Sequence, residues 1–515
     1  MKTIQIDLTP EEYFTEELLR KAAAKELHTT SENIAHVEVV KRSLDSRRGI
    51  RYHATAEVYM AGEPIAEKDY SAPYQDCHSG EPIVIVGAGP AGLFAALKAL
   101  EKGLKPIIVE RGKPVKERKL DIAQLAREKL VNPESNWCFG EGGAGTFSDG
   151  KLYTRSNKRG NIEEVIRKFV EHGADPKIMI DAHAHIGTDR LSGIIANMRE
   201  TIVSHGGEYH FECRVTDLIT DGDNKVCGVI DHRGNRYEGK AVILATGHSA
   251  RDIYELFGQK GWKIEAKPFA MGVRVEHPQR LINSIQYHTE NYSPLLPPAS
   301  YSLVTQVGRH GVFSFCMCPG GVIVPAATAD GQQVVNGMSN SNRNSPFANS
   351  GIAVTVGLED VPQYSQYGEL ALLRFQQDVE RRVFEAAGNS IKAPSQRLTD
   401  FVKGKPSSHL NKSNYMGECV SANVYEILPD FVVEGLQQGF MDFGRKMRGF
   451  YTAEASVLAV ESRTSSPVRI PRDKETLEHP QLHGLYPCGE GAGYAGGIVS
   501  SAMDGMRCVE KISIL

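Results

Sequence analysis

Two cysteines stand two residues apart in the stretch GVFSFCMCPGGVIVP, where Cys316 and Cys318 precede a proline and two glycines. Thiols spaced in this way can store two electrons as a disulfide, or they can act as small polarizable packing groups. On an extended strand, alternation places both thiols on one face, opposite the face that carries Phe313, Phe315 and Met317. Two strand residues span roughly 6.6 Å, the long edge of disulfide geometry, so a bond between the thiols needs local pinching. We expect packing close to a redox centre, with a dithiol relay as the alternative interpretation of the pair.

A complete dinucleotide-binding unit is predicted by the stretch PIVIVGAGPAGLFAALKALEKGLKPIIVERG. A buried strand leads through three glycines into a helix rich in alanine and leucine, and a second strand follows. Gly87 permits the tight turn, Gly89 lets a pyrophosphate approach backbone amides, and Gly92 lets helix and strand pack closely. Glu110, at the end of the second strand, offers a carboxylate to the ribose hydroxyls of an adenosine and disfavours a 2'-phosphate. The residues that we expect at this cofactor are Gly87, Gly89, Pro90, Ala91, Gly92, Glu110 and Arg111.

A second cofactor motif lies in the stretch HGLYPCGEGAGYAGGIVSSAMDGMRCVEKI. It predicts a short strand, an acidic residue at Glu490 and a Gly-Gly step that opens a final helix. The positive end of that helix, at Gly497, would stabilise negative charge on a bound cofactor. Between the two motifs, a meander of strands ends in an apolar strand at Thr246 and Gly247. An amide-rich loop over 140–150 is suited to line a cofactor or its phosphates, with a plain flexible loop as the alternative.

Taken together, these stretches and the segments HIGTDRL, ATGHSARD, FCMCPGG and ESRTSSPVRI resemble a bacterial family of uncharacterised FAD-dependent dehydrogenases. The family is also described as NAD(P)/FAD-dependent oxidoreductases with a glutathione-reductase-like FAD-binding fold. The resemblance spans nearly the whole chain and implies FAD as the cofactor, but it implies no substrate. In such flavoproteins the acid that matches Glu490, usually an aspartate, binds the ribityl chain, and the residue that matches Val215 contacts adenine through its backbone. The further residues that we expect at FAD are Gly143, Ser148, Val215, Thr246, Gly247, Gly489, Glu490, Gly497 and Ile498.

The chain of 515 residues exceeds what one hydrophobic core usually supports, so we expect several domains. The predicted fold class is α/β, with a Rossmann-type, glutathione-reductase-like FAD domain over 80–262 and 461–515. An antiparallel β-rich substrate domain with one long helix interrupts it over 263–460, and a small N-terminal α+β module occupies 1–78. Only one dinucleotide fingerprint is present, so NAD(P)H is expected either to reduce the flavin slowly or to bind transiently in the pocket of the other substrate.

Four residues are the catalytic candidates, namely the two cysteines, His248 and Arg463. His248 follows the ATG element and is placed to donate a proton near the flavin, with a hydrogen-bonded structural role as the alternative. Arg463 belongs to ESRTSSPVRI, whose donors suit a carboxylate or phosphate, with domain packing as the alternative. Arg343, in a polar loop, is expected either to close over a ligand or to lie in a plain connection. His183 and His185 have strand spacing without a third ligand, so we predict a structural use and no metal site.

The net charge of −4 and a pI near 6.5 give no electrostatic reason to expect a membrane or nucleic-acid partner. The cysteines are odd in number and scattered, which suits reduced thiols, and with no secretory signal we expect a cytoplasmic protein. We predict an FAD-dependent oxidoreductase that acts on a small molecule by hydride transfer at flavin N5, with its oligomeric state undetermined. The alternatives are a flavin-dependent RNA-modifying enzyme, suggested by the basic hairpin over 41–51, and a non-catalytic redox sensor or scaffold.

Overall fold

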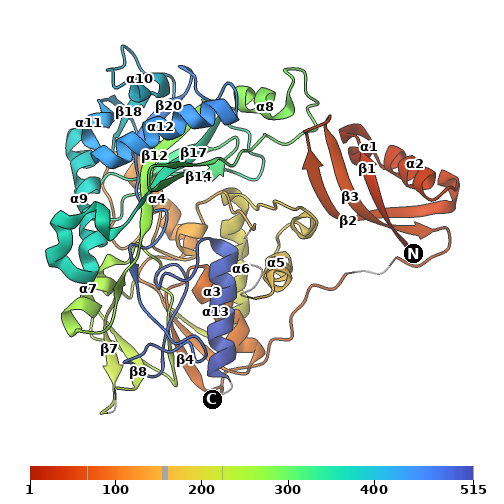
Figure 1. Ribbon diagram of the computed structural model, residues 1–515. Coiled ribbons are helices and arrows are strands. Elements are labelled where there is room, and N and C mark those ends of the chain that lie inside the picture. Colours follow the sequence, from red (N-terminus) through yellow and green to blue (C-terminus); the bar gives the residue numbers. More distant parts are fainter. Residues whose placement is uncertain (66–67, 154–159, 223, 514–515) are drawn as a thin grey trace.

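The computed structural model describes residues 1–65, 68–153, 160–222 and 224–513, and Figure 1 shows their arrangement. Near the N-terminus three antiparallel strands form a sheet in the order β1-β3-β2, with a short and a longer helix beside it. Thr15 has an extended backbone and separates the two helices. The bounds are β1 Lys2–Leu8, α1 Pro10–Phe14, α2 Glu16–Glu26, β2 Ile34–Asp45 and β3 Arg51–Met60.

This N-terminal sheet lies to one side of the molecule, at the end of a long connection (Figure 1). Its strand β2 contacts the central domain through Arg42, whose amide donates to Ile180 O (2.8 Å) and whose carbonyl accepts from Ala182 N (3.1 Å). The Arg42 guanidinium also forms an ion pair with Asp181, with Nη2 3.0 Å from Oδ2. A paired side chain and two backbone hydrogen bonds therefore join β2 to the loop over 180–182.

The central domain is built on a five-stranded parallel sheet in the order β22-β10-β4-β5-β6. Helix α3 follows β4 and packs closely against the last helix, α13 (Figure 1). The predicted strand-helix-strand unit and the predicted final strand and helix are confirmed. The bounds are β4 Pro82–Val86, α3 Pro90–Glu101, β5 Lys105–Val109, β6 Glu208–His210, β10 Val242–Leu244, β22 Leu485–Pro487 and α13 Ile498–Ile512.

Further elements surround this parallel sheet. Strands β7, β8 and β9 form the predicted meander, and β11 pairs with β21. Among the helices that the structure describes, none combines the length and the apolar character needed to cross a bilayer. The bounds are α4 Val115–Glu128, α5 Ile162–Glu171, α6 Thr188–Ser204, β7 Val215–Thr220, β8 Val226–Asp231, β9 Arg236–Glu238, α7 Arg251–Lys260, β11 Glu265–Ala266 and β21 Val468–Arg469.

A second sheet, of seven strands in the order β13-β14-β17-β12-β20-β18-β19, lies between β11 and β21 in the sequence. Neighbouring strands within this sheet pair in antiparallel fashion, except that β18 and β19 are parallel to each other. The strands are β12 Phe269–Pro278, β13 Val304–Val307, β14 His310–Cys318, β17 Phe347–Val356, β18 Ala393–Arg397, β19 Cys419–Ser421 and β20 Ser456–Glu461, with β15 Val322–Pro325 and β16 Val335–Met338 paired separately. The helices are α8 Gln279–Tyr287, α9 Ala371–Ala386, α10 Leu398–Val402, α11 Val424–Ile427 and α12 Asp430–Lys446.

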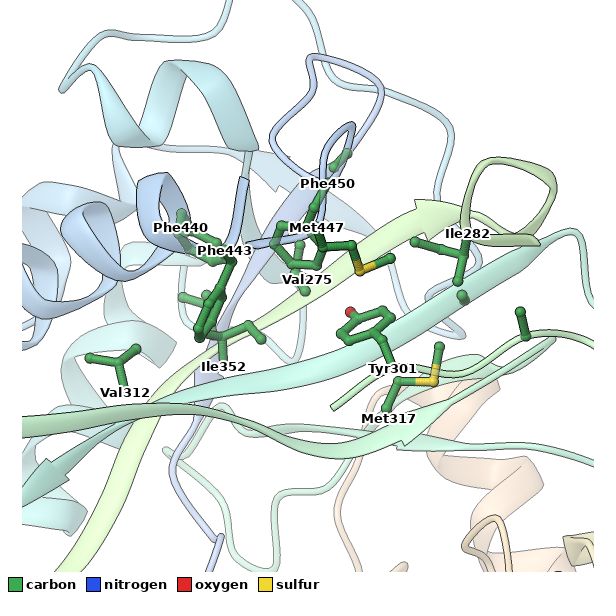
Figure 2. Close-up of a cluster of buried hydrophobic side chains, with 14 of the residues drawn as sticks. Val275, Ile282, Tyr301, Val312, Met317, Ile352, Phe440, Phe443, Met447 and Phe450 are labelled. Carbon is green, nitrogen blue, oxygen red and sulfur yellow. The ribbon is translucent and has the colours of Figure 1, made fainter. Parts of the chain in front are cut away.

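Helix α12 is a correction to the sequence analysis, which predicts α9 as the one long helix of this inserted domain. Its glycines weaken the helical pattern in the sequence, because glycine has a low helix propensity. In the fold they permit close packing, since a Cβ on Gly435 would lie 2.9 Å from Val354 and one on Gly439 would lie 2.7 Å from Val312. Figure 2 shows the resulting core, whose labelled members are Val275, Ile282, Tyr301, Val312, Met317, Ile352, Phe440, Phe443, Met447 and Phe450.

Candidate active site

A groove with a cavity of about 350 Å³ lies where α3 and α13 begin. At its centre, Gly87 has φ 106°, and a Cβ there would lie 2.5 Å from Ala245 O. A Cβ on Gly92 would overlap Gly87 O, so helix and strand approach as the fingerprint requires. A Cβ on Gly89 would meet only Gly143 Cα, at 3.8 Å, among the described atoms within 4 Å. Gly89 therefore leaves an open backbone surface at a helix N-terminus, which fits a pyrophosphate.

The groove gathers predicted cofactor residues from six separated segments of the chain. Gly92 is absent from its lining because it packs behind the turn, against Gly87. The open φ 119° position of Gly497 caps α13, so amides at the start of that helix face the groove. The predicted residues that line the groove are Gly87, Gly89, Pro90, Ala91, Glu110, Arg111, Gly143, Ser148, Val215, Thr246, Gly247, Gly489, Glu490, Gly497 and Ile498.

Glu110 is buried at the wall of this groove and has backbone partners of its own. Its Oε2 accepts from Ala88 N at 2.8 Å, and its Oε1 accepts from Gly112 N and Gly140 N, both at 2.9 Å. These three amides hold the carboxylate in place and connect the glycine turn to the loop at Gly140. Oε2 keeps acceptor capacity for a ribose hydroxyl, and that role of Glu110 stays a prediction.

Glu490 and His248, which also line the groove, form a linked pair. Glu490 accepts from Gly497 N, and its Oε2 lies 3.2 Å from His248 Nδ1. Burial alone would raise the pKa of Glu490, but His248 and the Gly497 amide outweigh burial and lower it. The second ring nitrogen of His248 is 3.0 Å from Arg463 O. Both ring nitrogens are thus engaged, and the structure favours the structural interpretation of His248 over the proton donor.

Arg463 borders the groove, but its guanidinium is committed to protein partners. It bonds to both oxygens of Glu380, at 3.2 and 3.1 Å, and to Thr328 Oγ1 at 2.8 Å and Gln332 Oε1 at 2.8 Å. Arg251 also donates to Glu380, at 2.7 Å. Burial would raise the pKa of Glu380, and the two arginines outweigh burial and lower it to about 2. The structure therefore favours domain packing over ligand binding for Arg463.

Cys316 and Cys318 lie on a β-bulge, so the strict strand alternation that the sequence predicts for them is wrong. Phe315 is opposite Gly351 and Cys318 is opposite Asn349, so β14 holds one extra residue. Cys316 takes a left-handed backbone, with φ 45°. As a result Phe315 and Cys316 line the same groove, although strict alternation places them on opposite faces.

Both sulfurs nonetheless approach one amine, because Lys151 Nζ lies 3.9 Å from Cys316 Sγ and 4.0 Å from Cys318 Sγ. A hydrogen bond from Cys318, together with Lys151 and Arg274, lowers the pKa of Cys316 well below its ordinary value despite burial. The same hydrogen bond and burial raise the pKa of Cys318. Arg274 also donates to Cys316 O at 2.8 Å and is paired with Glu461 at 2.7 Å. The site thus favours a thiolate at Cys316 and a thiol at Cys318.

A second, larger cavity of about 1660 Å³ adjoins the groove. The two share Lys151, Tyr153, Phe315, Cys316, Gly496 and Ser500 as lining residues. Among the described residues that line the larger cavity, none is acidic. Its basic and imidazole side chains are Lys151, His183, His288, Arg343, Lys446 and Arg448. Such a cavity favours an anionic ligand.

The polar loop that carries Arg343 is tied to the central domain. Arg343 donates to both oxygens of Asp149, at 3.1 and 2.5 Å, and Ser341 O lies 3.1 Å from His185 Nε2. Within the described parts of the chain, no cluster of three or more candidate ligands is arranged for a metal ion. His185 thus has the structural contact that the sequence analysis favours.

Sequence reasoning missed three residues of the candidate site. Lys151 directly follows the glycine-rich loop over 140–150. Its place in the sequence could have indicated a positive charge beside the predicted cofactor loop. Arg274 interrupts the apolar strand FAMGVRVEHP, where a buried charge requires a partner. Arg448 carries no local signal, because only the packing of α12 brings it to the larger cavity.

Comparisons with known proteins match the domains found in the structure. Residues 81–264 match the family model described as pyridine nucleotide-disulphide oxidoreductase, residues 268–464 match that of the FAD-dependent protein, C-terminal domain-like, and residues 1–59 match a domain of unknown function. An uncharacterized protein of Clostridium beijerinckii is 39% identical over 517 residues, covering 96% of this chain and 95% of that protein. A digeranylgeranylglycerophospholipid reductase of Picrophilus torridus is 25% identical over 237 residues, 44% of this chain and 54% of that protein. A solved geranylgeranyl bacteriochlorophyll reductase-like structure from Thermoplasma acidophilum has a TM-score of 0.34 and 13% identity, covering 84% of this chain and 79% of that chain.

Proposed function

We propose that this chain, which belongs to a family of FAD-dependent oxidoreductases, acts on an anionic small molecule. The proposed reaction is hydride transfer between that molecule and N5 of the flavin. The observation that carries the proposal is the common wall of the groove and the larger cavity. Phe315 and Cys316 from the inserted sheet meet Gly496 and Ser500 of the central domain at that wall. A substrate in the larger cavity would therefore reach a flavin in the groove.

The residues of the groove fit FAD and would hold it in a defined orientation. The open surface of Gly89 and the start of α3 would receive the pyrophosphate, while Glu110 would hold the adenosine ribose. The start of α13 at Gly497 would lie against the pyrimidine edge, where its partial positive charge stabilises a reduced flavin. This arrangement supports a glutathione-reductase-like subtype of the fold as part of the proposal.

The charge of the larger cavity supports the substrate class. Lys446 and Arg448 lie near one stretch of its wall, and Lys151 stands where it meets the groove. Cations at two places would orient an anion by its charged group and leave its reacting atom toward the flavin. NAD(P)H, whose phosphates are anionic, would enter this same cavity transiently, because the described chain has one parallel five-stranded sheet with one glycine fingerprint.

The test begins with the identity of the flavin, which is extracted from the purified full chain and separated by chromatography. FAD is the expected result, and FMN or a lack of flavin after reconstitution would overturn the proposal. The FAD-loaded protein is then mixed anaerobically with a panel of anionic, neutral and cationic metabolites while the visible flavin band is recorded. Bleaching by anionic members supports the substrate class. Bleaching only by neutral or cationic members would refute it.

A further inference from the structure

The bulge on β14 brings two thiols, one amine and both cavities to a single point. Cys316 is partly exposed and lines the groove and the larger cavity, whereas Cys318 is buried behind it. Cys318 Sγ lies 3.3 Å from Cys316 O, and Lys151 Nζ is within 4.0 Å of both sulfurs. A bulge bends and shortens the strand, so the two thiols escape the spacing that a flat strand would impose.

We propose that Cys316 and Cys318 form a reversible disulfide that exchanges two electrons with the FAD of the adjoining groove. The flavin part of this statement rests on the proposed function. In the exchange, the Cys316 thiolate and the Cys318 thiol form one S–S bond and release two electrons and the Cys318 proton. Oxidised FAD takes both electrons and that proton, which gives the anionic reduced flavin, and the reverse step restores thiolate and thiol. The pair therefore adds a second two-electron store beside the flavin.

The charges around Cys316 suit its role as the reacting sulfur. Lys151 stands beside the sulfur, and Arg274 binds the carbonyl of the same residue. The negative groups that face this point are Asp149, which is 3.3 Å from Lys151, and Glu461, which is paired with Arg274. Each cation thus keeps a counter-ion, and the amine remains in contact with both sulfurs. A thiolate so placed reacts faster than the protonated Cys318 behind it.

A second cysteine pair in the chain provides a matched control. Cys488 and Cys508 are also within hydrogen-bonding distance of each other, and both are fully buried. Cys508 Sγ accepts from Arg472 at 3.8 Å and lines neither cavity, while Cys488 lines the groove but not the larger cavity. Only the Cys316 pair therefore has a thiol at the larger cavity, and we assign the redox role to that pair and not to Cys488 and Cys508.

The first experiment counts electrons in an anaerobic dithionite titration of the FAD-loaded full chain. The wild-type protein should take up four electrons per FAD, and Cys316→Ser and Cys318→Ser should each take up two. Cys508→Ser should still take up four. Uptake of two electrons by the oxidised wild-type protein would overturn the proposal.

The second experiment is independent of activity and of folding by the serine variants. Wild-type full chain, with or without bound flavin, is oxidised with diamide, alkylated, digested and weighed by mass spectrometry. The peptide that contains both cysteines should lose two hydrogens and resist alkylation until it is reduced. A disulfide found between Cys488 and Cys508 instead, or unmodified thiols at β14, would contradict the proposal. A chain that retains no FAD would overturn the proposed function alone, since this measurement still decides whether the pair forms a bond.

Lys151 supplies a third readout, because it is the positioning residue for the thiolate. In Lys151→Met the pH midpoint for alkylation of Cys316 should rise by at least about one unit, which is a tenfold change in the acid dissociation constant of the thiol. Lys151→Arg should restore most of the shift, since it keeps the charge. An unchanged midpoint in Lys151→Met would remove the amine from the proposal.

Discussion

The groove and the larger cavity share one wall, yet backbone forms most of the first and side chains form most of the second. The groove is shaped by backbone, because Gly89 and Gly497 leave open surface there and Gly87 makes a tight turn in which a Cβ would lie 2.5 Å from Ala245 O. The larger cavity is shaped by side chains that converge from distant segments, among them Lys151 and Arg448. Backbone geometry of the first kind is set by short motifs, whereas convergence of the second kind is set by the whole fold. This difference explains why the sequence indicates the cofactor clearly and the substrate hardly at all.

The largest effect that we expect comes from adding a single methyl group at Gly92, which should disrupt the groove. In Gly92→Ala the new Cβ would overlap Gly87 O, so helix α3 must move away from the turn. We expect a loss of about 4 kcal/mol or more in the free energy of unfolding and no retained FAD. The measurements are thermal unfolding and the ratio of flavin to protein absorbance.

Gly89→Ala is the matched control for this prediction. Its Cβ would have only Gly143 Cα near it, at 3.8 Å, so the flavin-free protein should unfold at nearly the wild-type temperature. FAD retention should still fall, because the methyl occupies the surface intended for the pyrophosphate. Normal FAD content in Gly92→Ala would show that the turn is not a rigid element.

The contact between the central domain and the inserted domain, beside the groove, should be the next most sensitive place. Glu380→Ala leaves Arg251 and Arg463 buried without their shared carboxylate, and such a loss costs about 3–5 kcal/mol. Urea unfolding measures the change. Glu385→Ala, at an exposed position of the same helix α9, should change stability by less than about 0.5 kcal/mol. Equal effects of the two substitutions would contradict the buried network.

A buried carboxyl in the inserted sheet should make stability depend on pH. Glu276 accepts from Asn414 N at 3.0 Å through Oε1, while its Oε2 has no partner within the described residues. Burial raises the pKa of Glu276 from 4.5 to about 7. The folded state therefore binds the proton more tightly than the unfolded chain, so this contribution is complete below pH 4.5 and is lost as the pH rises through about 7.

At about 1.4 kcal/mol per pKa unit, the loss amounts to about 3 kcal/mol. Glu276→Gln removes the titration and keeps an acceptor for Asn414, so its stability relative to wild type should improve above pH 7. Urea unfolding across this pH range is the measurement. Parallel pH profiles for the two proteins would place the titration elsewhere.

The smallest effect that we expect comes from a substitution in the wall of the larger cavity. Arg448→Glu reverses a charge at its wall and should raise KM for an anionic substrate about tenfold, equivalent to about 1.4 kcal/mol. The flavin spectrum should not change, because Arg448 does not line the groove. Arg445→Glu is the control, since Arg445 is exposed near the end of α12 and lies outside both linings. A KM that responds equally to both substitutions would reflect general charge and not this cavity.

Particular residues show where prediction from sequence succeeds and where it stops. Gly87 and Gly92 could be assigned because a tight turn followed by a close helix imposes a local pattern that only glycine fits. The bulge at Cys316 could not be foreseen, since an extra strand residue leaves no mark in an alternating sequence and is defined only by its partner strand. Lys151 was missed for a related reason, because its position in a loop says nothing about which sulfurs it will meet.

The sheet order β22-β10-β4-β5-β6 has a consequence for the nascent chain. During synthesis β4, β5 and β10 leave the ribosome long before β22, and the whole inserted domain emerges in the interval. Until then the edge of β10 lacks its partner and α3 lacks the cover of α13. An unpaired strand edge invites wrong pairing, so this interval is the aggregation-prone stage of folding. The groove that would hold the cofactor is therefore complete only after α13 has emerged, so we expect cofactor loading to be a late event that ends this interval.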